Sequence, residues 1–286
     1  MTHIRPADAL TAAGTAVAFL AAAAGLAVPG LFRDTPFWAD QARGTDLATL
    51  LLVTPVLALG LVTAQRGSQF GRLAVVGGLL YLIYNYAIFS FAVAMNPLTI
   101  AYIAALGAAV WALALSLPVL DASALAADAR ARLPRRLTAV VLVSVALLFG
   151  ALWLGQIVSA LVTGALPSDL VRAGLPTNPV YALDLGLFLP LALLSGAALW
   201  RGHPAGPVLF AMPMLLWLCW TSAGIVASFS LQAASGAAVP LPIAILVAAI
   251  GLLTGAIPAA AVLSGRRQIG HHRRDLPTGR VRGSEA

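Results

Sequence analysis

The chain has 286 residues, of which 60% are hydrophobic and 9% are charged, and its formal net charge is +7. A soluble domain usually carries about 25% charged residues, so this chain has too few charges to cover a surface in water. The composition therefore predicts a membrane protein and argues against reading the positive charge as a nucleic-acid site. All 17 basic residues are arginine, which excludes a retinal or pyridoxal Schiff base because both need a lysine amine.

Eight apolar runs are long enough to cross a membrane, since a spanning helix needs about 20 apolar residues. They cover residues 10–31, 47–64, 73–95, 98–120, 137–163, 182–200, 207–231 and 238–264. The runs are continuously apolar, which disfavours the alternating strands of a membrane barrel. The sequence thus predicts an all-α, polytopic membrane helical bundle of eight transmembrane helices. We expect one domain over residues 1–265, with the first run retained as a span, and a basic, disordered tail over 266–286.

The arginines fall unevenly on the two sides of these spans. With the N-terminus placed in the cytoplasm, only Arg33, Arg43 and Arg172 lie on the outer side, and every other arginine lies on the inner side. Positively charged loops stay in the cytoplasm, so we expect both termini there, in a bacterial cytoplasmic (inner) membrane. Membrane lipids are expected partners, because the arginine-rich inner loops and tail would contact anionic headgroups.

An internal repeat is indicated when the chain is shifted by 135 residues. Pro55 then meets Pro190 and Arg66 meets Arg201, at equivalent points of equivalent spans. Each unit has four spans, so we predict a parallel 4+4 repeat with halves at about 10–120 and 137–264, unless the matches only reflect lipid constraints common to both halves. Pro55 and Pro190 are expected to break their helices and to expose backbone groups toward a cavity.

The stretch "YLIYNYAIFSF" (81–91) places polar side chains inside the third span. At helical spacing Tyr81, Tyr84 and Asn85 share a face, whereas Tyr86 points the other way. The same face carries small residues nearer the helix start, so we expect it to pack inward. An interhelical hydrogen bond from Asn85 and a place in a ligand cavity both remain open.

Asp184 is the strongest single candidate for a functional residue, because it is a carboxylate at or just inside the end of the sixth span. A carboxylate at membrane depth usually faces the interior and is a functional hypothesis, although a helix N-cap in the headgroup zone is the structural alternative. Gln156, which shares a helix face with Trp153, and Thr221, beside Trp217 and Trp220, add further polar groups. We expect a ligand site open to the outside, made by Asp184, Asn85, Gln156, Tyr81, Tyr84, Trp217 and Trp220.

Several chemistries find no support in the sequence. No histidine lies in a predicted span, which removes paired haem ligands and histidine-based metal sites. Walker and GxSxG motifs are missing, and the single cysteine, Cys219, has no histidine in its span. We therefore expect no cofactor and no metal, and we assign no catalytic residue.

Two stretches, "RGSQFGRLAVVGGLLYLIYNYAIFSFAVAMNPLTIAYIAALG" (66–107) and "NPVYALDLGLFLPLALLSGAALWRGHPAG" (178–206), resemble a group of uncharacterised multi-span bacterial inner-membrane proteins. The resemblance covers roughly a quarter of the chain and implies no activity. Three functions stay open. The leading one is binding or transport of a small neutral or amphipathic molecule. The second is a non-transporting sensor or assembly subunit with a membrane-protein partner. The weakest is an intramembrane enzyme acting on a lipid or isoprenoid, with Asp184 as acid.

Overall fold

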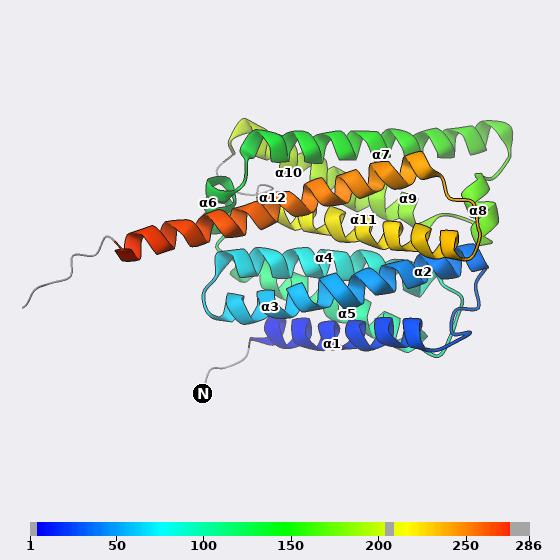
Figure 1. The fold of residues 1–286 in the computed structure, drawn as a ribbon, viewed down its shortest axis with the longest axis horizontal. Helices are drawn as coiled ribbons and strands as arrows, with labels where there is room; N and C mark the ends of the chain where they lie inside the picture. The colour runs from blue at the N-terminus through cyan, green and yellow to red at the C-terminus, as the bar shows by residue number, and fades with distance from the viewer. Residues whose placement is uncertain (1–4, 204–208, 275–286) are drawn as a thin grey trace, which may run out of the picture.

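The computed structural model describes residues 5–203 and 209–274, which fold as helices with no strand among them (Figure 1). Eight helical segments are long and apolar enough to cross a membrane, which confirms the predicted number and makes the chain a multi-pass membrane protein. Their bounds are Pro6–Ala27, Pro36–Gln65, Gln69–Ala92, Thr99–Ser116, Arg135–Thr163, Pro179–Arg201, Ala211–Ala234 and Leu241–Leu263.

The first four spans form what we call the first half. It consists of α1 (Pro6–Ala27), α2 (Pro36–Ala48), a π-helical turn (Thr49–Val53), α3 (Thr54–Gln65), α4 (Gln69–Ala92) and α5 (Thr99–Ser116). A short 3-10 turn (Leu117–Val119) and α6 (Ala122–Arg132) lead to the second half. That half consists of α7 (Arg135–Thr163), α8 (Ser168–Ala173), α9 (Pro179–Leu183), a second π turn (Asp184–Phe188), α10 (Leu189–Arg201), α11 (Ala211–Ala234) and α12 (Leu241–Arg274).

The second span begins much earlier than predicted, at Pro36 rather than residue 47. Thr35 caps the helix, its hydroxyl accepting a hydrogen bond from the Trp38 amide at 3.3 Å, and Pro36 supplies a preset first turn. Residues 36–46 include charged side chains, which lowered the local hydropathy and suggested a loop. Asp46 is consequently a buried intrahelical carboxylate, 1% exposed, and not a loop residue.

Helix α4 is buried on all sides, not only on the face that the sequence pattern selected. Tyr86, expected to point away from the interior, is itself buried, and its hydroxyl donates to the Ala18 carbonyl at 3.0 Å. The reason is that α4 packs on α3, α5 and α11, so both of its faces meet protein. This central helix ties the two halves together.

The halves also meet where α2 crosses α11. A Cβ atom on Gly44 would lie 2.4 Å from the Ser228 backbone nitrogen and 2.6 Å from the Gly224 carbonyl oxygen, so only glycine fits there. Small residues allow such close approach of membrane helices. The α2–α11 crossing therefore fixes how the second half sits on the first.

Each π turn ends two residues before a proline. The amide of Thr54 bonds the Thr49 carbonyl, the amide of Leu189 bonds the Asp184 carbonyl, and Pro55 and Pro190 follow. A proline lacks the amide that would continue the α-helical ladder, and a π turn is a common way to absorb this irregularity. Both spans thus continue as helices through a local irregularity just before the proline. The two turns coincide under the 135-residue shift.

The two halves differ in how their first and fourth spans meet. In the first half α1 packs along α5, whereas in the second half α7 packs on α10 and has no packed interface with α12 within the described helices. No residue of α7 from 147 to 163 is buried. The second half is thus spread apart, and the first half is closed.

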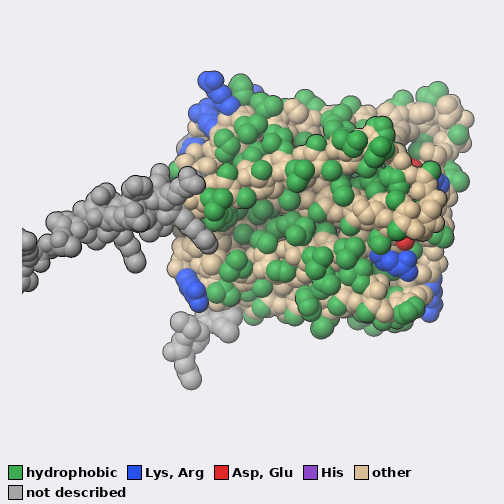
Figure 2. Space-filling view, viewed as in Figure 1, with side chains coloured by type: hydrophobic (Ala, Val, Ile, Leu, Met, Phe, Trp, Pro, Cys, Tyr) green, Lys and Arg blue, Asp and Glu red, His purple; other side chains and the backbone are tan. Residues whose placement is uncertain are grey.

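Both described ends of the chain lie at the same end of the bundle, which agrees with an even number of spans (Figure 1). Apolar side chains cover the middle of the molecular face and arginines gather toward its ends (Figure 2). Helix α12 continues to Arg274 and so includes the first part of the expected tail. Residues 275–286 lie outside the described residues, and the disorder of the tail stays a prediction.

Candidate functional site

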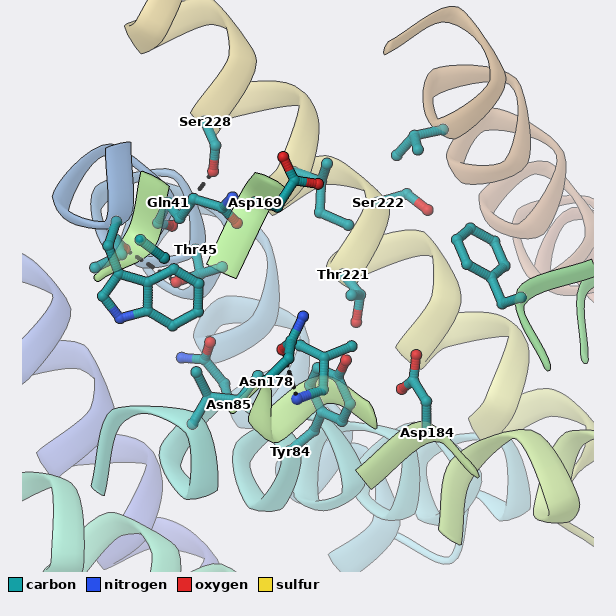
Figure 3. A pocket seen from close by; sticks show the side chains of 18 of the residues that line it. Gln41, Thr45, Tyr84, Asn85, Asp169, Asn178, Asp184, Thr221, Ser222 and Ser228 are labelled. Carbon is teal, nitrogen blue, oxygen red and sulfur yellow. Dashed lines mark hydrogen bonds between the residues drawn. The ribbon is translucent and has the colours of Figure 1, made fainter. Parts of the chain in front are cut away.

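A cavity of about 310 Å³ lies inside the bundle, between the closed first half and the spread second half. Its walls come from α2, α4, α7, the α8–α9 region, α11 and α12. Figure 3 shows Asp184, Thr221 and Asn85 reaching toward this space from three different elements. Of the seven ligand residues that the sequence predicts, six line the cavity: Asp184, Asn85, Gln156, Tyr81, Tyr84 and Trp217.

Asp184 begins the second π turn and is 5% exposed. Its Oδ2 accepts a hydrogen bond from the Trp153 indole nitrogen at 2.8 Å, while its Oδ1 is buried without a hydrogen-bond partner. The helix-cap alternative is wrong, because Asn178 caps α9, its side chain accepting from the Val180 amide at 3.0 Å. Asp184 is therefore a carboxylate inside the span, with Oδ2 aligned by Trp153 and the Tyr84 hydroxyl beside the carboxyl group.

Asn85 is 2% exposed, and its side-chain nitrogen has no hydrogen-bond partner within the described structure. The interhelical hydrogen bond proposed as its structural role is therefore not formed by that donor. Three further residues of α11 line the cavity and carry buried polar atoms that also have no partner: Trp217, Thr221 and Gln232. Unpaired donors and acceptors from α4, α11 and the π turn thus gather around one cavity.

An aromatic cluster forms one wall. Tyr84 packs edge-on against Phe188 and Trp217, with ring centroids 4.9 and 5.2 Å apart, and Phe188 stacks on Trp217 at 4.8 Å. Tyr81 is held from α2, since its hydroxyl lies 3.2 Å from the Thr49 hydroxyl and donates to the Thr45 carbonyl at 3.3 Å. These contacts make the wall rigid in advance of any ligand.

Trp220, the seventh predicted residue, does not line the cavity. It lies behind Tyr81, with ring centroids 6.1 Å apart and an edge-on geometry, and is buried. Trp217 and Trp220 are three residues apart on α11 and both pack on tyrosines of α4, but only Trp217 lines the cavity. The prediction was wrong because sequence spacing alone does not give the rotation of α11.

Pro55 and Pro190 do not line the cavity either, although cavity-lining backbone was expected at these breaks. Pro55 is exposed on the outer surface of its helix. The contribution of Pro190 is indirect, because the π turn before it presents Asp184 and Phe188 on the inner side. The adjacent Leu189 lines the cavity in its place.

Gln156 lies at one edge of the cavity, where its side-chain oxygen accepts a hydrogen bond from the Tyr181 hydroxyl at 2.5 Å. A shallow groove along the end of α7 shares Leu152, Gln156 and Asp169 with the cavity. This groove includes further polar side chains, among them Ser159 and Thr163. The α8 end of the bundle thus gives the cavity a polar approach.

The charges that line the cavity are few. Among the residues that line it, Asp184 is the only acid or base that comes from a spanning helix, and Asp169 and Arg172 belong to α8. Arg172 is engaged at the rim, with its guanidinium 4.1 Å from the centroid of the Phe37 ring. The interior is therefore apolar, with hydrogen-bonding groups and a single carboxyl.

Sequence reasoning missed Gln232, Ser228 and Gln41, which also line the cavity. A signal was present for two of them: Thr221, Ser228 and Gln232 share a helical face at spacings of seven and four residues. Gln41 gave no such signal, because it lies before residue 47, where the hydropathy pattern begins the second span. Within residues 5–203 and 209–274, no group of three His, Cys, Asp or Glu side chains is placed to hold a metal.

A second buried carboxyl, Asp46, lies outside the cavity. Its Oδ2 has no hydrogen-bond partner, and Gly25 makes room for it, since a Cβ there would lie 2.0 Å from that oxygen. Phe32 packs beside the same glycine. Asp46 is thus enclosed within the first half and has no access to the cavity.

No protein-family model, curated protein or solved structure matches this chain. The resemblance of residues 66–107 and 178–206 to uncharacterised inner-membrane proteins therefore adds nothing to the site. Any statement of function rests on the cavity and its residues.

Proposed function

We propose that this membrane protein binds a small neutral or amphipathic molecule in the cavity between its halves, as the recognition step of transport. One observation carries the proposal: of the ten described residues that have a buried side-chain polar atom without a partner, five line this one cavity, namely Asn85, Asp184, Trp217, Thr221 and Gln232. Each such atom costs about 1–3 kcal/mol when it stays unpaired. A bound molecule that pairs several of them recovers that free energy.

The chemistry of the lining supports a neutral polar group on the ligand. Asn85 and Trp217 offer N–H donors, Asp184 offers an acceptor, and Thr221 and Gln232 offer both. An anion would meet Asp184 with no cation nearby, since Arg172 is at the rim and lies over Phe37. The volume of about 310 Å³ is at the low end of ligand pockets, which span about 300–1,000 Å³.

We further propose that the chain spans a bacterial cytoplasmic membrane with both termini in the cytoplasm. The positions of the arginines support this orientation, because loops rich in arginine stay inside. The cavity then opens toward the outside at its α8 end. Reporter fusions placed after residue 35 and after residue 68 test the orientation. A reporter that is active only outside the cytoplasm should be active at the first site and inactive at the second.

A parallel duplication of four spans is part of the same proposal. The matching π turns at Thr49 and Asp184, each followed by a proline, support it. Transporters with parallel repeats place their substrate between the halves. The cavity of this protein occupies that position.

The experiment that tests binding is mass spectrometry of small molecules that co-purify in mild detergent. Wild type is compared with Asp184→Asn and with Asp46→Asn, a matched buried carboxyl outside the cavity. We expect a compound held by wild type and Asp46→Asn and lost, by at least about tenfold, from Asp184→Asn, the effect of one interaction worth ~1.4 kcal/mol. All three proteins must keep similar melting temperatures.

The same variants separate the remaining functions. If all three proteins yield the same spectra, with no compound that Asp184→Asn alone has lost, ligand binding in the cavity is refuted and a sensor or assembly subunit becomes the better interpretation. If a compound is identified instead, transport requires that its uptake or efflux fails in Asp184→Asn. A compound that wild type converts into a product would instead indicate an enzyme.

A further inference from the structure

We infer that the cavity opens sideways into the lipid between α7 and α12, and that its ligand is lipid-like, with a neutral hydrogen-bonding head inside the cavity and a hydrocarbon chain in this opening. The inference rests on the proposed function and makes it more specific. It names both the chemical class of the ligand and its path. Four structural features carry it.

The first feature is the missing helix interface. The first and fourth spans of the first half, α1 and α5, pack tightly, with Gly14 so close that a Cβ there would lie 3.1 Å from the Ala108 side chain. The corresponding spans of the second half, α7 and α12, have no packed interface within the described residues, yet both line the cavity. The cavity therefore separates two helices that would otherwise close the bundle.

The second feature is the chemistry of the two walls. Helix α7 contributes Phe149 and Leu152, and α12 contributes Ile243, Val247 and Ile250. Leu152 and Ile243 line the cavity and are 45% and 53% exposed, so the apolar lining continues to the outer surface of the bundle. Such a surface suits a hydrocarbon chain, and the polar side chains that α7 adds to the lining, Trp153 and Gln156, are already hydrogen-bonded to Asp184 and Tyr181.

The third feature is the gradient of polarity across the cavity. The unpaired polar atoms belong to the π turn, α4 and α11, while the side toward α7 and α12 is largely apolar. An amphipathic molecule that enters from the bilayer head first can place its head at the polar side of the cavity. Its hydrocarbon chain then lies against the apolar side, between α7 and α12. Because Asp184 is the only charged side chain that a spanning helix contributes to the cavity lining, a neutral alcohol, carbonyl or amide head fits better than a phosphate.

The fourth feature is size. A volume of about 310 Å³ holds a head and a few attached carbons, at the low end of the ~300–1,000 Å³ range of ligand pockets. The rest of a long chain must lie outside the enclosed space. The opening between α7 and α12 is the apolar exit that the lining residues provide, whereas the groove beside Gln156 and Ser159 is polar.

The test uses a diazirine-bearing hexadecanol as a photoreactive probe, with the full chain in phosphatidylcholine nanodiscs. Labelled peptides are located by mass spectrometry, and unlabelled hexadecanol is added as competitor. We expect saturable labelling on α7 around residues 149–152 and on α12 around 243–250. Labelling of lipid-facing positions such as Ile103 on α5, which is 55% exposed, should not saturate.

Variants make the path specific. Leu152→Trp places bulk in the opening, and Leu154→Trp is its matched control, since Leu154 lies on the same helix, is 53% exposed and does not line the cavity. We expect Leu152→Trp to raise the half-saturating probe concentration by about tenfold, and Leu154→Trp to leave it unchanged. Ile243→Trp should repeat the first result from the opposite wall.

Two results would overturn the inference in different ways. If cavity residues such as Tyr84 are labelled saturably and equally in wild type, Leu152→Trp and Ile243→Trp, the lateral opening is refuted while ligand binding in the cavity stands. If labelling does not saturate anywhere and Asp184→Asn behaves like wild type, lipid-like binding is refuted altogether. A disulfide-linked dimer of Leu152→Cys in a Cys219→Ser background would place a second copy of the chain in the opening and also refute it.

Discussion

The first half of the molecule is closed where the second half is open, although both use small residues on their outer helices. In the first half, Gly14 of α1 fits against Ala108 of α5, and Ala105 and Ala109 are fully buried. In the second half, Gly150 and Gly155 of α7 have no atom within 4 Å of where a Cβ would lie. Small residues therefore permit a close helix interface but do not create one, and the cavity lies between the closed first half and the open second half.

The two buried carboxyls repeat this contrast. Asp46 is enclosed by the first half beside Gly25 and Phe32, whereas Asp184 faces the cavity and is aligned by Trp153. Both have one oxygen without a hydrogen-bond partner. The two carboxyls thus differ in their access to the cavity, not in their depth of burial.

The largest difference is expected when a large side chain replaces a packed glycine of the first half or an unpacked glycine of the second half. Gly14→Leu should lower the free energy of unfolding by about 2–3 kcal/mol, because the side chain has no space between α1 and α5. Gly150→Leu, the matched change on α7, should stay within about 0.5 kcal/mol of wild type. Thermal unfolding in the same detergent checks both. Equal losses in the two variants would mean that α7 is packed and that the contrast between the halves does not hold.

A smaller effect is expected from the tyrosine hydroxyls that join helices in each half. Tyr86→Phe removes the buried bond to the Ala18 carbonyl and should cost about 1 kcal/mol. Tyr181→Phe removes the bond to Gln156 at the partly exposed edge of the cavity, and it should cost less because water can replace the partner. The melting temperatures of the two variants show which substitution costs more stability. A larger decrease in Tyr181→Phe than in Tyr86→Phe would contradict a spread second half.

The smallest effect concerns Asp34, which lies in the loop before α2 and accepts a hydrogen bond from the Ala94 amide at 2.8 Å. Partial burial raises the pKa of Asp34, although the bond from Ala94 opposes this. The folded state therefore holds the proton more tightly than the unfolded state. The stabilisation from protonation is fully present below the unfolded pKa and is lost as the pH rises through the folded pKa.

Asp34→Asn lacks this titration. The melting temperature of wild type minus that of Asp34→Asn should therefore increase as the pH falls from about 7 to about 4. A difference that stays constant over this range, or decreases toward low pH, would contradict the burial of Asp34.

Much of the architecture was predictable because lipid restricts the options. Seven of the eight spans were placed within a few residues by length and hydropathy. The second span was placed too late because residues 36–46 are polar for a membrane helix, and the Thr35–Pro36 capping signal was overlooked. Because the predicted span began at residue 47, neither Gln41 nor the buried carboxyl of Asp46 was predicted to lie in a membrane helix.

The site was predicted in part, for identifiable reasons. Asp184, Asn85 and Gln156 stood out because polar side chains are rare in membrane spans, and the structure brings all three to one cavity. Trp220 was misplaced because the choice between two tryptophans three residues apart depends on the rotation of α11. Gln232 was missed although it continues the polar face of Thr221 and Ser228.

The amino-acid sequence by itself determined the solvent, the number of spans and the proline-linked helix irregularities, because each follows from local composition and backbone chemistry. Only the tertiary structure decided that α1 closes against α5 while α7 stands apart from α12, and hence that a cavity exists. The physical reason is that lipid solvates apolar helices as well as other helices do. Apolar sequence therefore leaves helix pairing undetermined, and close-fitting contacts such as Gly44 against Ser228 determine it.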